Sequence, residues 1–279
     1  MTQTVFITGT SSGIGLASAK LFFGKGWNVV ATMRAPEKDT ELKQLDPACM
    51  LVQRLDVQDQ STIESAIQAA LNKFGKIDLL INNAGYGQFG VFELLPPEKV
   101  KEQFDVNVFG VMNVTRAVLP HFRAQKSGGI INISSGAGIF GLPIMSLYNA
   151  SKFALEGFTE SLAYELAPLN IFVKSVIPHG GVSSTNFGRR NPFSPDELAK
   201  APEYGPFVQK TMEHYRKLIG GIQVSSAEVA KAIYDAATDG TEKLRYFIGQ
   251  DNRGFLKARY QTTSDDEYIA HMRSYYRSS

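Results

Sequence analysis

Residues 4–15 read Thr-Val-Phe-Ile-Thr-Gly-Thr-Ser-Ser-Gly-Ile-Gly, and this stretch decides the fold. A short apolar run leads into a glycine-rich turn, and a helical pattern of apolar residues follows. This is the context that a dinucleotide-binding loop requires, although a tight turn without a ligand is the alternative. Glycine lets the backbone approach a pyrophosphate closely, and the helix N-terminus offers free N–H groups. We therefore expect the cofactor-binding residues here to be Gly9, Ser11, Ser12, Gly13, Ile14 and Gly15.

Short apolar runs recur along the chain with helix-length segments between them. After residues 5–8 the runs are residues 28–32, 50–55, 79–82, 130–134, 171–177 and 245–248. Most are apolar at consecutive positions, which is typical of strands buried on both faces of a parallel sheet. The alternation of strands and helices predicts an α/β protein of the Rossmann type. We expect a doubly wound, seven-stranded parallel sheet with helices on both faces.

Two segments do not fit this alternation. Residues 186–221 contain four prolines and are interpreted as an insertion of short helices and loops near the substrate. Residues 251–279 form a C-terminal extension, which we expect to pack on a neighbouring subunit rather than cover the cleft. No repeat and no Pro-rich or Ser-rich linker divides the chain, so residues 1–279 are predicted to be one catalytic domain.

Composition and charge exclude several classes of protein. Lys and Arg total 29 and Asp and Glu total 27, so the net charge is +2 and no polybasic arm for nucleic acid is present. The single cysteine, Cys49, allows neither an intrachain disulfide nor a cysteine-based zinc cluster, and we expect no metal. No apolar stretch of about 18 residues and no signal peptide are seen, so we expect no membrane span and a cytoplasmic location.

Five motifs in order identify a family. The glycine spacing is Gly-x-x-x-Gly-x-Gly rather than Gly-x-Gly-x-x-Gly, and Asn82-Asn83-Ala84-Gly85 ends the fourth predicted strand. Asn107 lies in a helical segment, Ser135 follows the fifth strand, and Tyr148-x-x-x-Lys152 comes thirteen residues after Ser135. A Tyr-x-x-x-Lys pair alone is a weak signal, but the ordered set is specific. From residue 4 to residue 249 the chain resembles the short-chain dehydrogenase/reductase family, single-domain branch.

The tyrosine–lysine pair suits acid–base chemistry. Tyr148 and Lys152 are one helical turn apart and share a face. The ordinary pKa of tyrosine is near 10, and a nearby ammonium would lower it toward neutral pH, where proton transfer is efficient. The resemblance implies that Tyr148 exchanges the proton of the carbonyl oxygen and that Ser135 positions this oxygen. It also implies that Lys152 binds the nicotinamide ribose and that Asn107 holds a water which relays protons to Lys152.

The resemblance also implies a nicotinamide cofactor. Many NAD enzymes have an acid after the second strand, but here Met33 and then Arg34 occupy that place. A guanidinium suits a 2′-phosphate, so we predict NADP(H), with NAD(H) possible. The other residues that the resemblance places at the cofactor are Asp56, Val57, Asn83, Ala84, Gly85, Tyr148, Lys152, Gly180, Val182 and Thr185.

His179 stands where the family usually has proline. We interpret it as a loop histidine held by backbone rather than as a ligand contact.

The loop after Ser135 is apolar and predicts the substrate class. Candidate substrate contacts are Phe140, Leu142, Met145 and Phe187, with Phe193 and Phe207 as further candidate walls. They favour a bulky apolar ketone, aldehyde or alcohol as a small-molecule substrate and therefore a carbonyl reductase or alcohol dehydrogenase.

Three other functions remain open. They are a non-catalytic cofactor-sensing relative, an NAD-dependent alcohol or hydroxysteroid dehydrogenase and, less well matched, a sugar-nucleotide epimerase or dehydratase. A homodimer or homotetramer is expected through the helix of residues 100–122 and the helix after Tyr148.

Overall fold

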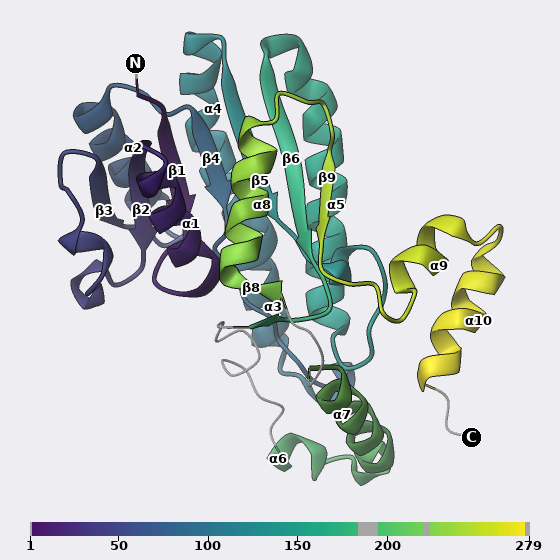
Figure 1. The fold of residues 1–279 in the computed structure, drawn as a ribbon. Coiled ribbons are helices and arrows are strands. Elements are labelled where there is room, and N and C mark those ends of the chain that lie inside the picture. Colours follow the sequence, from purple (N-terminus) through teal and green to yellow (C-terminus); the bar gives the residue numbers. More distant parts are fainter. Residues whose placement is uncertain (1, 184–194, 220–223, 277–279) are drawn as a thin grey trace.

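A parallel sheet forms the centre of the protein (Figure 1). The computed structural model describes residues 2–183, 195–219 and 224–276. The seven strands lie in the order β3-β2-β1-β4-β5-β6-β9, and every neighbouring pair is parallel. Their bounds are β1 Thr4–Thr8, β2 Asn28–Met33, β3 Met50–Arg54, β4 Leu79–Asn82, β5 Gly128–Ile133, β6 Ile171–Pro178 and β9 Arg245–Ile248. The predicted doubly wound, seven-stranded sheet is confirmed.

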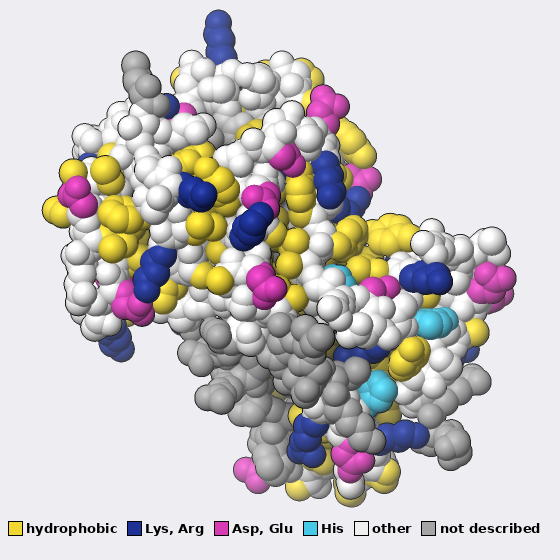
Figure 2. All heavy atoms as spheres, viewed as in Figure 1, with side chains coloured by type: hydrophobic (Ala, Val, Ile, Leu, Met, Phe, Trp, Pro, Cys, Tyr) yellow, Lys and Arg dark blue, Asp and Glu magenta, His cyan; other side chains and the backbone are white. Residues whose placement is uncertain are grey.

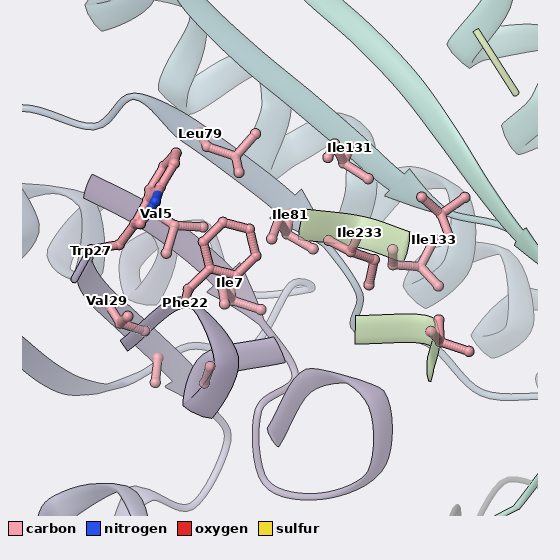
Figure 3. Packing of buried hydrophobic residues seen from close by; sticks show 14 of the residues in the cluster. Val5, Ile7, Phe22, Trp27, Val29, Leu79, Ile81, Ile131, Ile133 and Ile233 are labelled. Atoms are coloured by element: carbon pink, nitrogen blue, oxygen red, sulfur yellow. The ribbon is translucent and has the colours of Figure 1, made fainter. Parts of the chain in front are cut away.

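Helices cover both faces of the sheet. One face carries α1 (Gly13–Gly24) and α8 (Ser226–Thr238), whose apolar side chains join a core with alternate residues of the strands. Figure 3 shows Phe22 of α1 and Ile233 of α8 in this core. The opposite face carries α2 (Gln60–Phe74), α4 (Val111–Gln125) and α5 (Ser146–Leu166). The residues of the inner strands are therefore buried on both sides, which explains their continuous apolar sequences.

The remaining helices are short or lie at one end of the sheet. Helix α3 (Pro97–Phe104) continues through a π-helix, η4 (Asp105–Gly110), into α4. The short 3₁₀ helices are η1 Pro36–Lys38, η2 Leu42–Gln44, η3 Phe92–Leu94, η5 Gly136–Gly138, η6 Ala167–Leu169 and η8 Pro202–Tyr204. Beyond the sheet lie α6 (Pro195–Leu198), α7 (Gly205–Ile219) and the small parallel pair of β7 (Val182–Ser183) and β8 (Val224–Ser225).

The C-terminal extension forms two helices, α9 (Phe255–Gln261) and α10 (Asp265–Tyr276), beside the β9 edge (Figure 1). Buried residues of both, such as Phe255 and Tyr268, pack on Phe140 and Ile177. The extension therefore packs on its own chain. Packing on a neighbouring subunit stays a prediction.

One strand begins earlier than its sequence predicts. Strand β5 covers Gly128–Ile133, whereas residues 130–134 were expected. A Cβ at Gly128 would lie 2.4 Å from the ring of Phe122, and one at Gly129 would lie 2.1 Å from the ring of Phe172. The two glycines are needed for this close packing, although glycine is normally depleted in strands.

No helix in the described ranges has the length and apolar character needed to cross a membrane. In the same residues no three His, Cys, Asp or Glu side chains gather as metal ligands. On the face shown in Figure 2, basic and acidic side chains of the described residues are interspersed, so these residues do not form a field of one sign.

Candidate active site

The glycine loop is shaped by left-handed backbone and by close contact with β4. Gly9 has φ +73° and Gly13 has φ +59°, conformations that favour glycine. Gly15 has a different role, because a Cβ there would lie 2.3 Å from the Gly9 carbonyl oxygen and 2.4 Å from Asn83 Nδ2. Gly15 therefore serves the close packing of helix, loop and β4. It does not line the cleft, whereas Gly9, Ser11, Ser12, Gly13 and Ile14 do.

The Asn83-Ala84 segment holds the glycine loop in place. Asn83 Nδ2 donates to the carbonyl oxygens of Thr8 (2.8 Å) and Gly9 (3.0 Å). The backbone N–H groups of Asn83 and Ala84 both donate to Thr8 Oγ1, each at 3.0 Å. Four hydrogen bonds thus join the end of β4 to the end of β1. Asn83, Ala84 and Gly85 also line the cleft, in agreement with their expected place at the cofactor.

The N-terminus of α1 fits a bound pyrophosphate. No side chain caps it, and its first turn holds no acidic residue. Ser12, Gly13 and Ile14 at this end line the cleft, so the first N–H groups of the helix are positioned to bind an anion. A helix end of this kind supplies both donors and a partial positive charge.

Two basic side chains stand at the far end of the cofactor region. Strand β2 ends at Met33, and Arg34 lines the cleft immediately after it. Lys38, which the sequence analysis missed, lines the same cleft because η1 turns the chain back. Neither side chain forms an ion pair within the described residues. Asp56 and Val57 line the cleft after β3, as expected.

Ser135, Tyr148 and Lys152 meet at the other end. Ser135 follows β5, and its Oγ accepts from the Ala137 N–H at 3.2 Å and is hydrogen-bonded with Tyr148. Tyr148 and Lys152 lie one turn apart on α5, with Lys152 Nζ 5.8 Å from the Tyr148 ring centroid. Lys152 Nζ donates to the Ile133 carbonyl oxygen at 2.8 Å. All three residues line the cleft and both tyrosine and lysine are buried.

The pKa of Tyr148 moves in the direction opposite to the expectation. Burial raises it to about 12, and the hydrogen bond with Ser135 only partly offsets this. Burial also lowers the pKa of Lys152 to about 8, against the opposing effect of the Glu156 carboxylate. The expected lowering of the Tyr148 pKa by Lys152 is absent here, since desolvation dominates and the ammonium is directed at the Ile133 carbonyl.

Asn107 holds a loop rather than lining the cleft. It is fully buried in the π-helix η4. Its Nδ2 donates to the Tyr86 carbonyl oxygen (2.8 Å) and to Ser151 Oγ (3.2 Å), and its Oδ1 accepts from the Tyr86 N–H (3.1 Å). The side chain therefore fixes the backbone after β4 against α5. The expected role in a proton relay to Lys152 stays a prediction.

The part of the cleft in which we expect a substrate is lined by the loop after Ser135 and by residues of the C-terminal half. Phe140, Leu142 and Met145 line it, as expected, in a cleft of about 1390 Å³ that also contains the cofactor region. The lining residues that the sequence analysis missed include Tyr215, Arg253 and Phe255. Tyr215 Oη donates to the Pro143 carbonyl oxygen at 2.8 Å, which ties α7 to this loop.

Several other expected residues have different outcomes. Phe207 is 43% exposed and is not among the cleft-lining residues, and its contact with a substrate stays a prediction. Thr185, Phe187 and Phe193 lie outside the described residues. Gly180 and Val182 line the cleft.

His179 also lines the cleft. Its backbone N–H donates to the Ile248 carbonyl oxygen at 2.9 Å, and burial lowers the pKa of its side chain.

Comparisons with known proteins agree with this geometry. A family model described as short chain dehydrogenase matches residues 3–193. The chain belongs to the short-chain dehydrogenase family. This short-chain dehydrogenase is 38% identical to the uncharacterized oxidoreductase YusZ of Bacillus subtilis, covering 89% of each chain. It is 31% identical to human 17-beta-hydroxysteroid dehydrogenase type 1, covering 96% of this chain and 84% of the relative.

Solved structures show the same fold and the class of cofactor. A short-chain dehydrogenase from Streptomyces avermitilis superposes with a TM-score of 0.77 at 32% identity, covering 98% of this chain and 93% of the other. ElxO with NADP bound (TM-score 0.71, 25% identity, 88% and 98% coverage) binds one form of the cofactor. A 3-ketoacyl-(acyl-carrier-protein) reductase from Brucella melitensis is complexed with NADH. It superposes with a TM-score of 0.73 at 26% identity, covering 88% of this chain and 96% of the other. The comparisons support an oxidoreductase with a nicotinamide cofactor.

Proposed function

We propose that this short-chain dehydrogenase interconverts a ketone or aldehyde and an alcohol by hydride transfer, with NADP(H) preferred and Tyr148 as the general acid and base. One observation carries the proposal: Ser135, Tyr148 and Lys152 line the same cleft as the glycine loop and Arg34. The apolar walls around Phe140 favour a substrate with a bulky apolar body.

The geometry favours proton donation by Tyr148. Because its pKa is raised to about 12, the phenol holds its proton at neutral pH and is ready to donate it to a carbonyl oxygen. Ser135, hydrogen-bonded with Tyr148, is placed to hold the same oxygen. Lys152, with a pKa of about 8, stays mostly charged at neutral pH, and we assign its ammonium to the ribose of a bound nicotinamide. A bound nicotinamide supplies or accepts the hydride.

Replacing Tyr148 with phenylalanine tests the catalytic role. Tyr148→Phe should lower kcat roughly 10²–10⁴-fold, since the proton donor is lost, while NADPH still binds in a fluorescence titration. Tyr164→Phe is the matched control on α5, because Tyr164 is 69% exposed. Full activity in Tyr148→Phe contradicts the proposal. Tight NADPH binding by the unaltered protein without turnover of any carbonyl compound would favour the cofactor-sensing alternative.

Arg34 and Lys38 support the NADP(H) preference. Both line the cleft at the end where a 2′-phosphate would lie, and charged hydrogen bonds to phosphate are strong. Replacing both with serine should lower kcat/KM for NADPH more than 10-fold and leave kcat/KM for NADH nearly unchanged. Lys43→Ser is the control, because Lys43 is exposed and outside the cleft. Equal efficiency of the unaltered enzyme with NADPH and NADH contradicts the preference.

We also propose a homodimer, with a homotetramer as the larger alternative. Phe109 of η4 is 51% exposed and Phe153 of α5 is 42% exposed, on two elements that contact each other. Exposed large apolar side chains of this kind often mark an interface. Phe109→Glu should lower the mass measured by light scattering to that of a monomer. Phe92→Glu, at a 60% exposed phenylalanine of η3, should leave the mass unchanged. A monomeric unaltered protein contradicts the proposal.

A further inference from the structure

Arg253 reaches the substrate side of the cleft from the loop between β9 and α9. Helix α10 holds its backbone there. The Arg253 carbonyl oxygen accepts hydrogen bonds from His271 Nε2 (3.1 Å) and from Tyr275 Oη (3.0 Å). The C-terminal extension therefore fixes the position of Arg253, which is not a free surface arginine.

Aromatic rings surround the guanidinium of Arg253. It lies over the ring of Phe255, with 5.3 Å to the ring centroid, and Phe255 is fully buried. Tyr215 and Tyr276 are close enough to affect the pKa of Arg253, which burial lowers. The Tyr276 hydroxyl lies within hydrogen-bonding reach of the guanidinium. The charge is thus partly removed from water by apolar surfaces.

No carboxylate of the described residues forms an ion pair with this charge. Asp251 is nearest in sequence, but its carboxylate accepts from the backbone N–H groups of Leu256 (3.2 Å) and Lys257 (2.9 Å) at the start of α9. A half-buried guanidinium is costly unless an anion meets it, and its planar donors match a carboxylate well.

We propose that Arg253 binds a carboxylate of the substrate, so that the enzyme acts on oxo acids and hydroxy acids in which an apolar body separates the carboxylate from the reacting carbon. This inference rests on the proposed carbonyl–alcohol activity. The apolar side chains of Phe140, Leu142 and Met145 line the same cleft and suit the body of such a substrate. Tyr215 joins the wall near Arg253 to the loop after Ser135.

A series of aryl ketones tests the proposal. The probes are ω-benzoylalkanoates, with two to eight methylenes between ketone and carboxylate, and the matching primary amides. For the best chain length, kcat/KM of the acid should exceed that of the amide at least 10-fold, since a charged hydrogen bond is lost in the amide. In Arg253→Gln this ratio should fall to about 1, mainly through KM of the acid. Arg253→Lys should restore part of it.

Controls separate the outcomes. Arg273→Gln, at an exposed arginine of α10 outside the cleft, should keep the ratio of the unaltered enzyme. NADPH affinity should be the same in Arg253→Gln as in the unaltered protein. The proposal is overturned if Arg253→Gln still prefers the acid over the amide. It is also overturned if the substitution lowers the affinity for NADPH instead of the preference for the acid.

A binding measurement keeps the test independent of turnover. Calorimetry with 5-phenylpentanoate and 5-phenylpentanamide on the NADPH-bound full chain should show acid-selective binding that Arg253→Gln abolishes. If no ketone of the series is reduced but this selectivity is present, the proposed activity fails while the anion site stands. If the series is reduced without acid selectivity in either measurement, the anion site fails while the activity stands.

Discussion

Replacing Gly15 with alanine should separate the structural role of the glycine loop from the general effect of alanine in a helix. The added Cβ would meet the Gly9 carbonyl oxygen at 2.3 Å and Asn83 Nδ2 at 2.4 Å, so loop and helix must move apart by about 1 Å. Overpacking of this kind costs about 1–3 kcal/mol. Loss of the Asn83–Gly9 hydrogen bond adds about 1 kcal/mol, and the better helix propensity of alanine returns about 1 kcal/mol.

Gly24→Ala in the same helix is the matched control. No atom lies within 4 Å of a Cβ at Gly24, so the change should be neutral or stabilise by up to about 1 kcal/mol. The free energy of unfolding measured in urea should therefore be lower in Gly15→Ala than in the unaltered protein by about 1–3 kcal/mol. NADPH affinity should fall at least 10-fold in Gly15→Ala and stay unchanged in Gly24→Ala. If the two variants have the same free energy of unfolding and the same affinity for NADPH, the argument from close packing is refuted.

Two pH-dependent predictions concern Lys152 and Asp239. The kcat/KM for ketone reduction should be constant below about pH 8 and fall above it, because burial lowers the pKa of Lys152 to about 8 and the cation is lost there. Lys152→Gln should have a low kcat/KM that does not decline above about pH 8. If kcat/KM of this variant shows the same pH dependence as the unaltered enzyme, the decline does not come from Lys152. For Asp239, burial alone would raise the pKa, but hydrogen bonds from Lys174 and Tyr246 lower it far below the usual value. Its stabilising effect is thus present above about pH 4 and lost as the pH falls further. The urea midpoint of unfolding, measured from pH 7 to pH 3, should fall less steeply in Asp239→Asn than in the unaltered protein. Midpoints that fall in parallel in the two proteins contradict a stabilising effect of the Asp239 carboxylate.

The arrangement of the sheet was predictable because its inner strands are buried on both faces. Apolar residues then stand at consecutive positions, as in residues 79–82, and the strand is visible in the sequence. The start of β5 was not predictable. Gly128 and Gly129 suit that strand only because the rings of Phe122 and Phe172 lie against them, and these contacts are long-range packing.

The candidate catalytic residues and the glycine loop could be found in the sequence because their spacing along the chain is itself the signal. Arg253 was not, since α9 and α10 must first pack before it reaches the cleft. Lys38 required the turn of η1 to bring it to the cleft that Arg34 also lines. The pKa direction of Tyr148 depended on its burial, which no spacing reveals.

The hydrogen bonds from Asn83 and Ala84 to Thr8 have a consequence for synthesis on the ribosome. All the glycines of the loop are made within the first 15 residues, but the groups that hold the loop come about 70 residues later. A nascent chain that ends before β4 therefore contains the whole glycine motif without its partners. We expect the loop to become able to bind NADPH only after β4 has emerged and paired with β1, so that nucleotide capture marks a defined stage of folding during translation.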